Sequence, residues 1–177
     1  MRCALSDKAS SMTTVNHSAP STQDALALLR ADHLHIERVL ADCERLVNDD
    51  SLSSQADRSG LVARLGALLQ AHLRIKSELF EPAFAHPGND AGQDAGHDHD
   101  DTLQRLAQLN AAEAKPGGFA AALAEFADSW RAHVANEEGQ QLPSAQRAAV
   151  ERGIDLLALG TAMAQRRGEL LGDQGVD

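Results

Sequence analysis

The sequence predicts an all-α protein: an antiparallel up-and-down four-helix bundle with an additional C-terminal helix and a disordered N-terminal tail. From residue 22 onward, apolar residues recur every three or four positions, which is the period of one face of an α-helix. No strand-like alternation, Asn-Gly hairpin or glycine-rich phosphate loop interrupts this pattern. The chain of 177 residues is long enough for one domain, so we expect residues 22–171 to form the bundle.

Residues 1–21 are predicted to form the disordered tail, because they are rich in serine, threonine and asparagine and show no periodicity. The first helix should begin at Ser21 or Thr22, whose hydroxyl groups are good N-caps, and end near residues 48–51. Its apolar stripe contains Leu26, Leu29, Ile36, Leu40, Cys43 and Val47. His33 occupies one position of this stripe, where an apolar residue is expected.

A second helix follows, with an apolar stripe over Leu61, Leu65, Leu68, Ile75 and Leu79. His72 again takes a stripe position, and Pro82 and Pro87 are expected to end the helix. Residues 86–100 are expected to form a loop rich in glycine, aspartate and histidine, whose end supplies acidic residues to the start of a third helix. The third stripe contains Leu103, Leu106 and Leu109. His99 continues it toward the N-terminus.

The fourth helix is expected after the helix-breaking segment at residues 115–118. Its stripe runs through Phe119, Leu123, Phe126 and Trp130. The same face then carries two polar residues, His133 and Glu137, before Pro143, which should bend or end the helix. Residues 145–171 predict one last amphipathic helix, packed outside the bundle. Its apolar positions are Val150, Ile154, Leu157, Leu159 and Met163.

Composition excludes several classes of function. The chain has 26 acidic and 16 basic residues, a net charge of −10 and only 3% aromatic residues, so nucleic acids and anionic membranes are not expected partners. Its two cysteines, Cys3 and Cys43, cannot form a disulfide framework. With no signal-peptide pattern and no long apolar segment, the protein is expected to be cytoplasmic.

Four histidines occupy stripe positions on four different predicted helices: His33, His72, His99 and His133. In an antiparallel bundle these positions fall at the same end of the core, and Glu137 lies one turn from His133 on the same face. A single buried histidine is usually hydrogen-bonded to a carbonyl group, but four left unpaired at one depth would be costly. Metal coordination explains the set, because imidazole and carboxylate ligands suit iron, zinc, manganese and copper. We therefore expect these four histidines and Glu137 to bind metal.

The motifs around these residues resemble those of the hemerythrin-like domains, also called HHE cation-binding domains. The motif of the first helix reads Asp32-His33-x-x-Ile36, and that of the second reads His72-Leu73-Arg74-Ile75-x-x-Glu78-Leu79-Phe80-x-Pro82. The motif of the fourth helix reads His133-Val134-x-x-Glu137-Glu138-Gly139, followed by Leu142-Pro143. The third helix matches more loosely, with Asp98-His99. The resemblance covers residues 22–171. It implies a bundle whose core holds a non-haem iron pair that handles O2, NO or stored iron. It also implies that the metal ligands are His33, His72, His99, His133 and Glu137.

One residue departs from the family pattern. Members usually carry His-x-x-x-Glu in the second helix as well, but here Lys76 follows His72 by four residues, and the next residue is Ser77. An ammonium group beside two cations is electrostatically unfavourable. Lys76 would have to lose its proton, turn toward solvent or pair with Glu137. A mononuclear or asymmetric site therefore stays as open as a di-iron one.

Other carboxylates could compensate for the missing one. Glu37 follows His33 by four residues, and Asp100 and Asp101 follow His99, although such side chains usually stay at the surface. Glu78 matches the family pattern but lies about 120° around the helix from His72, so it points poorly at the same centre.

Several alternatives remain open at this stage. His97 could replace His99 as a ligand, since helix ends are uncertain by a residue or two. His35 should point away from the site, and Glu138 should face water or bond a ligand histidine. No nucleophile motif is present, so the sequence favours metal-centred binding over catalysis. The competing hypothesis is a bundle that has lost its metal through Lys76 and acts as a structural or regulatory interaction module.

Overall fold

The computed structural model describes residues 23–47, 52–85, 91–113 and 117–172. The predicted tail at residues 1–21 lies outside these ranges. Every element within them is helical, which confirms the all-α prediction. None of the helices in these ranges is long and apolar enough to cross a membrane.

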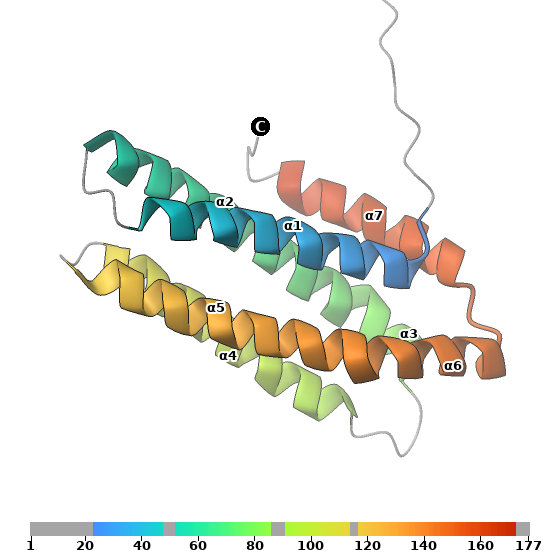
Figure 1. The fold of residues 1–177 in the computed structure, drawn as a ribbon. Helices are drawn as coiled ribbons and strands as arrows, with labels where there is room; N and C mark the ends of the chain where they lie inside the picture. Colours follow the sequence, from blue (N-terminus) through green and yellow to red (C-terminus); the bar gives the residue numbers. More distant parts are fainter. Residues whose placement is uncertain (1–22, 48–51, 86–90, 114–116, 173–177) are drawn as a thin grey trace, which may run out of the picture.

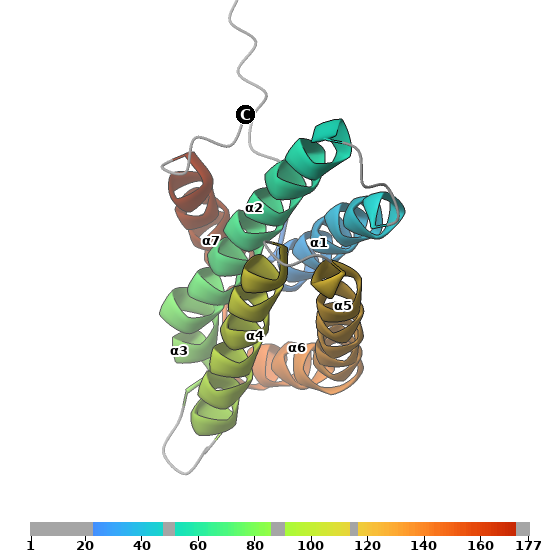
Figure 2. The same cartoon turned by 90° about the vertical axis from the view of Figure 1, so that its left-hand side faces the viewer.

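Four long helices form the bundle: α1 (Ala25–Leu46), α2 (Leu52–Ile75), α4 (Ala91–Glu113) and α5 (Gly118–Asn136). Successive helices run in opposite directions (Figure 1), as the short connections require. Viewed toward one end, the four helices surround a common axis (Figure 2). In this ring α1 contacts α2 and α5, and α4 contacts the same two helices. The predicted up-and-down bundle is therefore confirmed.

The second and fourth bundle helices each continue through a π-helical turn into a further helix. These segments are η1 (Lys76–Phe80) with α3 (Glu81–Phe84), and η2 (Glu137–Gln141) with α6 (Leu142–Arg152). Pro82 and Pro143 are each the second residue after a π turn. The wider π turn relieves the clash between proline and the carbonyl group four residues back. The prediction that the fourth helix could end at Pro143 is therefore wrong.

Two predicted helix starts are also wrong. Asp24, rather than Ser21 or Thr22, is the N-cap of α1, since its carboxylate accepts a hydrogen bond from the Ala27 amide at 2.8 Å. The helix α4 begins at Ala91, so most of the expected loop at residues 86–100 is helical. Aspartates near the N-terminus of a helix interact favourably with the helix dipole, which explains why this acidic segment can be helical.

The predicted last helix is two helices. Gly153, with a φ of 67°, ends α6 in the left-handed conformation that glycine adopts without strain. Asp155 then caps α7 (Leu156–Gly172) by accepting hydrogen bonds from the amides of Leu157 and Ala158. Two of the expected apolar positions, Val150 before the break and Leu157 after it, are exposed rather than buried. As predicted, α7 packs outside the bundle, against α1 and α2 (Figure 2).

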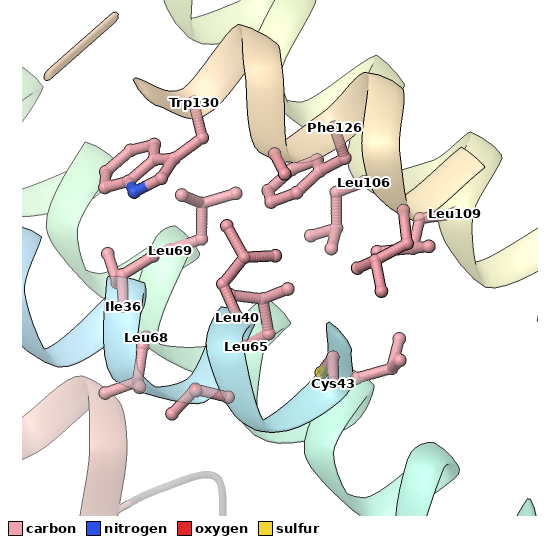
Figure 3. Close-up of a cluster of buried hydrophobic side chains, with 14 of the residues drawn as sticks. Ile36, Leu40, Cys43, Leu65, Leu68, Leu69, Leu106, Leu109, Phe126 and Trp130 are labelled. Atoms are coloured by element: carbon pink, nitrogen blue, oxygen red, sulfur yellow. The ribbon is translucent and has the colours of Figure 1, made fainter. Parts of the chain in front are cut away.

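The core consists of two apolar clusters separated by polar side chains. One cluster fills the bundle between α1, α2, α4 and α5, and Figure 3 shows Trp130 and Ile36 at the end opposite Leu109 and Cys43. The other cluster includes Leu29, Ile75, Leu142 and Met163. Between them lies a set of residues that we call the polar layer: His33, His72, Lys76, His99, His133 and Glu137. The two clusters therefore enclose the predicted ligands in a largely dry part of the protein.

Candidate metal centre

Side chains from three segments meet in the polar layer. His33 comes from α1, His72 from α2, and Glu137 is the first residue of η2. All three are buried, and each offers a ligand atom within 4.8 Å of the others. The Nε2 atoms of His33 and His72 lie 3.3 and 3.9 Å from Oε2 of Glu137. Two ligands of one metal ion, each about 2.1 Å from it, are about 3.0 to 3.5 Å apart. The His33 distance falls in this range, and the His72 distance of 3.9 Å is a little longer.

Two further groups approach the same carboxylate. Nε2 of His133, one turn earlier on α5, lies 3.1 Å from Oε2 of Glu137. Nζ of Lys76 lies 3.0 Å from this oxygen, and the Lys76 side chain is only 3% exposed. Of the alternatives open for Lys76, pairing with Glu137 is the one that the structure adopts.

The polar layer holds many buried polar atoms that make no hydrogen bond within the described part of the chain. These are Nε2 of His33, His72, His99 and His133, Nδ1 of His72, Oε1 of Glu81, and both carboxylate oxygens of Glu137. Buried polar groups without partners are costly and normally few. Their concentration at one place indicates a ligand that satisfies them together.

Groups next to the predicted ligand histidines orient the rings. Nδ1 of His33 lies 2.8 Å from Oε1 of Glu138, so the N–H at Nδ1 donates to this carboxylate, and Nε2 of the same ring faces Glu137. This contact confirms the predicted hydrogen bond between Glu138 and a histidine of the predicted site, whose role as a ligand stays a prediction. Nδ1 of His72 lies 3.7 Å from Oδ2 of Asp32, which pairs with Arg167 of α7 through its other oxygen.

Aromatic rings pack closely in this region. The Trp130 indole stacks on His133 at 5.4 Å between ring centroids, and meets His33 and His72 edge-on at 5.8 Å. Trp130 thereby joins the apolar cluster to the polar layer. It is also the one tryptophan of a chain without tyrosine, so its fluorescence reports on this site alone.

The charges in the polar layer shift two pKa values. Burial alone would raise the pKa of Glu137, but the imidazoles of His133, His33 and His72 and the Lys76 ammonium hold it well below its usual range. Burial opposes the charged form of His72, yet the carboxylates of Asp32 and Glu137 raise its pKa above the usual value. Glu137 is therefore anionic at neutral pH.

His99 is near the Lys76 charge but is not part of the group formed by His33, His72 and Glu137. It is buried on α4, and its Nε2 lies 3.4 Å from Oε1 of Glu81, the first residue of α3. Burial, helped by the charge of Lys76, lowers the pKa of His99 to about 4, so the ring is neutral at neutral pH. Burial raises the pKa of Glu81. The predicted ligand His99 is thus separate from the group of His33, His72 and Glu137.

The compensating carboxylates considered from the sequence do not reach the polar layer. Glu37 forms an ion pair with Arg131, and Asp101 forms one with Arg105, both at the surface. Asp100 is exposed. Glu78 pairs with Arg166, which agrees with its expected direction. The idea of a rearranged site built on Glu37 is therefore wrong, because the ion pair holds that side chain outside the bundle.

The other histidines considered from the sequence differ in where they lie relative to the polar layer. His35 is partly exposed and contacts Arg64 at 3.2 Å, away from the polar layer as predicted. The side chain of His97, the alternative to His99, lies outside the described residues, and so does His86. His99 is buried in the polar layer.

Sequence reasoning missed Glu81. In an uninterrupted α-helix it would lie about 180° around the axis from His72, on the opposite face. The π turn η1 adds one residue, and the Glu81 amide donates to the Lys76 carbonyl instead of the next one along. This shift brings Glu81 round to His99. Regular helical spacing does not predict that Glu81 lies near His99, and the only clue in the sequence is an acidic residue directly before Pro82.

These features define a class of protein: a helical bundle with a buried histidine and carboxylate site. The profile of the hemerythrin HHE cation-binding domain matches residues 24–145, which is more than half of the chain. The chain therefore belongs to the hemerythrin HHE cation-binding domain family, as the motifs indicated. Comparisons with curated proteins and with solved structures found no significant match. The matched region ends at residue 145, within α6 and before α7 begins.

Proposed function

We propose that this protein binds non-haem iron in the polar layer and exposes the ion to a small diatomic molecule, O2 or NO. The proposed ligands are His33, His72, His133 and Glu137. The observation that carries the proposal is the set of imidazole Nε2 atoms and Oε1 of Glu137, all buried and without hydrogen-bond partners in the described part of the chain. An imidazole and carboxylate donor set of this kind suits iron, zinc and manganese.

The chain's own groups prepare this site. Glu138 holds the His33 ring so that Nε2 faces Glu137. Lys76 keeps the Glu137 carboxylate charged and in place. The apolar clusters on both sides exclude water, which strengthens each electrostatic interaction within the layer. A ferrous ion bound here would supply an open coordination position for a diatomic ligand.

Anaerobic reconstitution with Fe(II), followed by iron analysis and Trp130 fluorescence, tests the proposal. We expect the bound iron to quench the fluorescence, because the indole contacts three of the proposed ligands. His72→Ala should abolish both the bound iron and the quenching. His35→Ala is the matched control, since His35 lies on α1 but faces Arg64 instead of the site. Circular dichroism should show that both variants are folded.

Addition of NO to the iron-loaded protein tests the diatomic ligand, with a new visible absorption band as the expected result. A folded wild-type protein that retains no iron, zinc or manganese would contradict the proposal. That result would favour the competing interpretation, a metal-free bundle that acts through protein contacts.

A further inference from the structure

We infer that the Lys76 ammonium stands in the place of the second cation of a two-metal site, so that this chain binds one metal ion. The inference rests on the proposed function, because it concerns the same polar layer. It specifies how many ions the layer holds and which group of ligand atoms remains without metal.

Lys76 and Glu137 are structural counterparts. Each is the first residue of a π turn, each follows a histidine of the polar layer by four residues, and each precedes a proline by six. Equivalent backbone geometry directs both side chains into the same layer, where Nζ of Lys76 lies 3.0 Å from Oε2 of Glu137. The bundle therefore presents one carboxylate and one ammonium where a symmetric arrangement would present two carboxylates.

The Lys76 charge acts on two groups of ligand atoms. The first consists of His33, His72, His133 and Glu137. The second consists of Nε2 of His99 and Oε1 of Glu81, 3.4 Å apart, a spacing that suits two ligands of one ion. Both atoms are buried without hydrogen bonds. The second group thus resembles a half-site with two ligands, next to a fixed positive charge.

Electrostatics decides against a second ion. Of the carboxylates that approach the layer, Asp32 is neutralised by Arg167 and Glu138 is exposed to solvent, so Glu137 and Glu81 are left to offset at most two positive charges. Lys76 contributes one positive charge, so one divalent ion leaves a net charge of +1 and two ions leave +3. In a buried layer this excess has little solvent to screen it.

Metal stoichiometry tests this inference. Wild-type protein, loaded anaerobically with Fe(II) and desalted, should retain about one iron per chain. Lys76→Glu should retain about two, because it removes the ammonium and supplies a carboxylate. Lys76→Gln, which removes the charge without adding a ligand, should stay at about one. The double variant Lys76→Glu with His99→Ala should return to about one, because the second half-site has lost its imidazole.

Arg74→Glu is the matched charge control, since Arg74 lies on the same helix but is exposed. It should retain about one iron. Two ions in the wild type would overturn the inference, and so would one ion in a folded Lys76→Glu variant. If the wild type bound no metal, the proposed function would be contradicted instead. In that case, a gain of two ions by Lys76→Glu would still identify Lys76 as the group that excludes metal.

Thermal unfolding gives a second readout. Without metal, Lys76→Glu should have a lower Tm than Lys76→Gln, because it places two carboxylates together with no cation. Fe(II) should raise the Tm of Lys76→Glu more than that of Lys76→Gln. An equal rise in the Tm of the two variants would contradict the inference that the Lys76 ammonium takes the place of a metal ion.

Discussion

Arg167, near the end of α7, forms an ion pair with Asp32, the residue that precedes His33 in α1. Asp32 is buried, and its second oxygen lies 3.7 Å from Nδ1 of His72. A helix beyond the matched family domain therefore holds a carboxylate that faces a proposed metal ligand. We expect α7 to influence the metal centre through this pair.

Replacing Arg167 with alanine should weaken metal binding by about tenfold, because Asp32 would lose the group that positions it toward His72. The measurement is a metal titration followed by Trp130 fluorescence. Arg166→Ala is the control, since Arg166 lies on the same helix but pairs with the exposed Glu78. Equal affinities for the two variants would show that Asp32 does not transmit an effect from α7.

Glu137→Gln should destabilise the metal-free protein by about 3 to 5 kcal/mol, because the buried Lys76 ammonium loses its carboxylate partner. Urea unfolding in the presence of a chelator measures this change. The double variant Lys76→Met with Glu137→Gln should recover part of the loss, since no charge is then left unpaired. A double variant less stable than Glu137→Gln alone would contradict this account of the ion pair.

Gly160→Ala should destabilise the protein by about 1 to 3 kcal/mol through overpacking. A Cβ atom at Gly160 would lie 2.3 Å from the Gln23 carbonyl oxygen and 2.7 Å from the Ala25 nitrogen, both backbone atoms at the start of α1. Gly168→Ala, on the same helix, would meet nothing within 4 Å and should be neutral or slightly stabilising. Urea unfolding of the two variants compares them directly, and equal stability would show that α7 can shift away from α1.

The periodicity of the sequence was enough to predict the bundle and the convergence of its histidines. His33, His72 and His133 interrupt apolar stripes, and regular helix geometry carries such positions to one depth of an antiparallel bundle. Their roles as ligands remain predictions. Family membership and the grouping of His33, His72 and Glu137 agree with them.

Features that depend on irregular backbone could not be predicted in the same way. The π turns at Lys76 and Glu137 change the helix register, so the approach of Glu81 to His99 has no signature in regular spacing. The ion pair between Asp32 and Arg167 joins residues 135 positions apart, and it depends on the angle at which α7 meets α1. Local patterns carry no information about that angle.

Acid should destabilise the metal-free protein through His99. Its pKa is about 4 in the folded state, because of burial and the nearby positive charge, against 6.5 for an ordinary histidine. Between these values the unfolded chain binds more protons than the folded protein, so stability falls as the pH falls from 6.5 toward 4. The charged or titratable groups that face His99 are Lys76, Glu81, His133, His72 and Glu137.

Glu137 and His72, which lie near His99, affect the stability of the fold in other pH ranges. The low pKa of Glu137 contributes stability that is lost only below the usual range of a carboxylate. The raised pKa of His72 contributes stability that is lost above pH 6.5. Urea unfolding with a chelator should therefore show a loss of about 1 to 2 kcal/mol between pH 6.5 and about 4.5 that His99→Gln removes. The same slope in wild type and His99→Gln would assign the acid sensitivity to a different group.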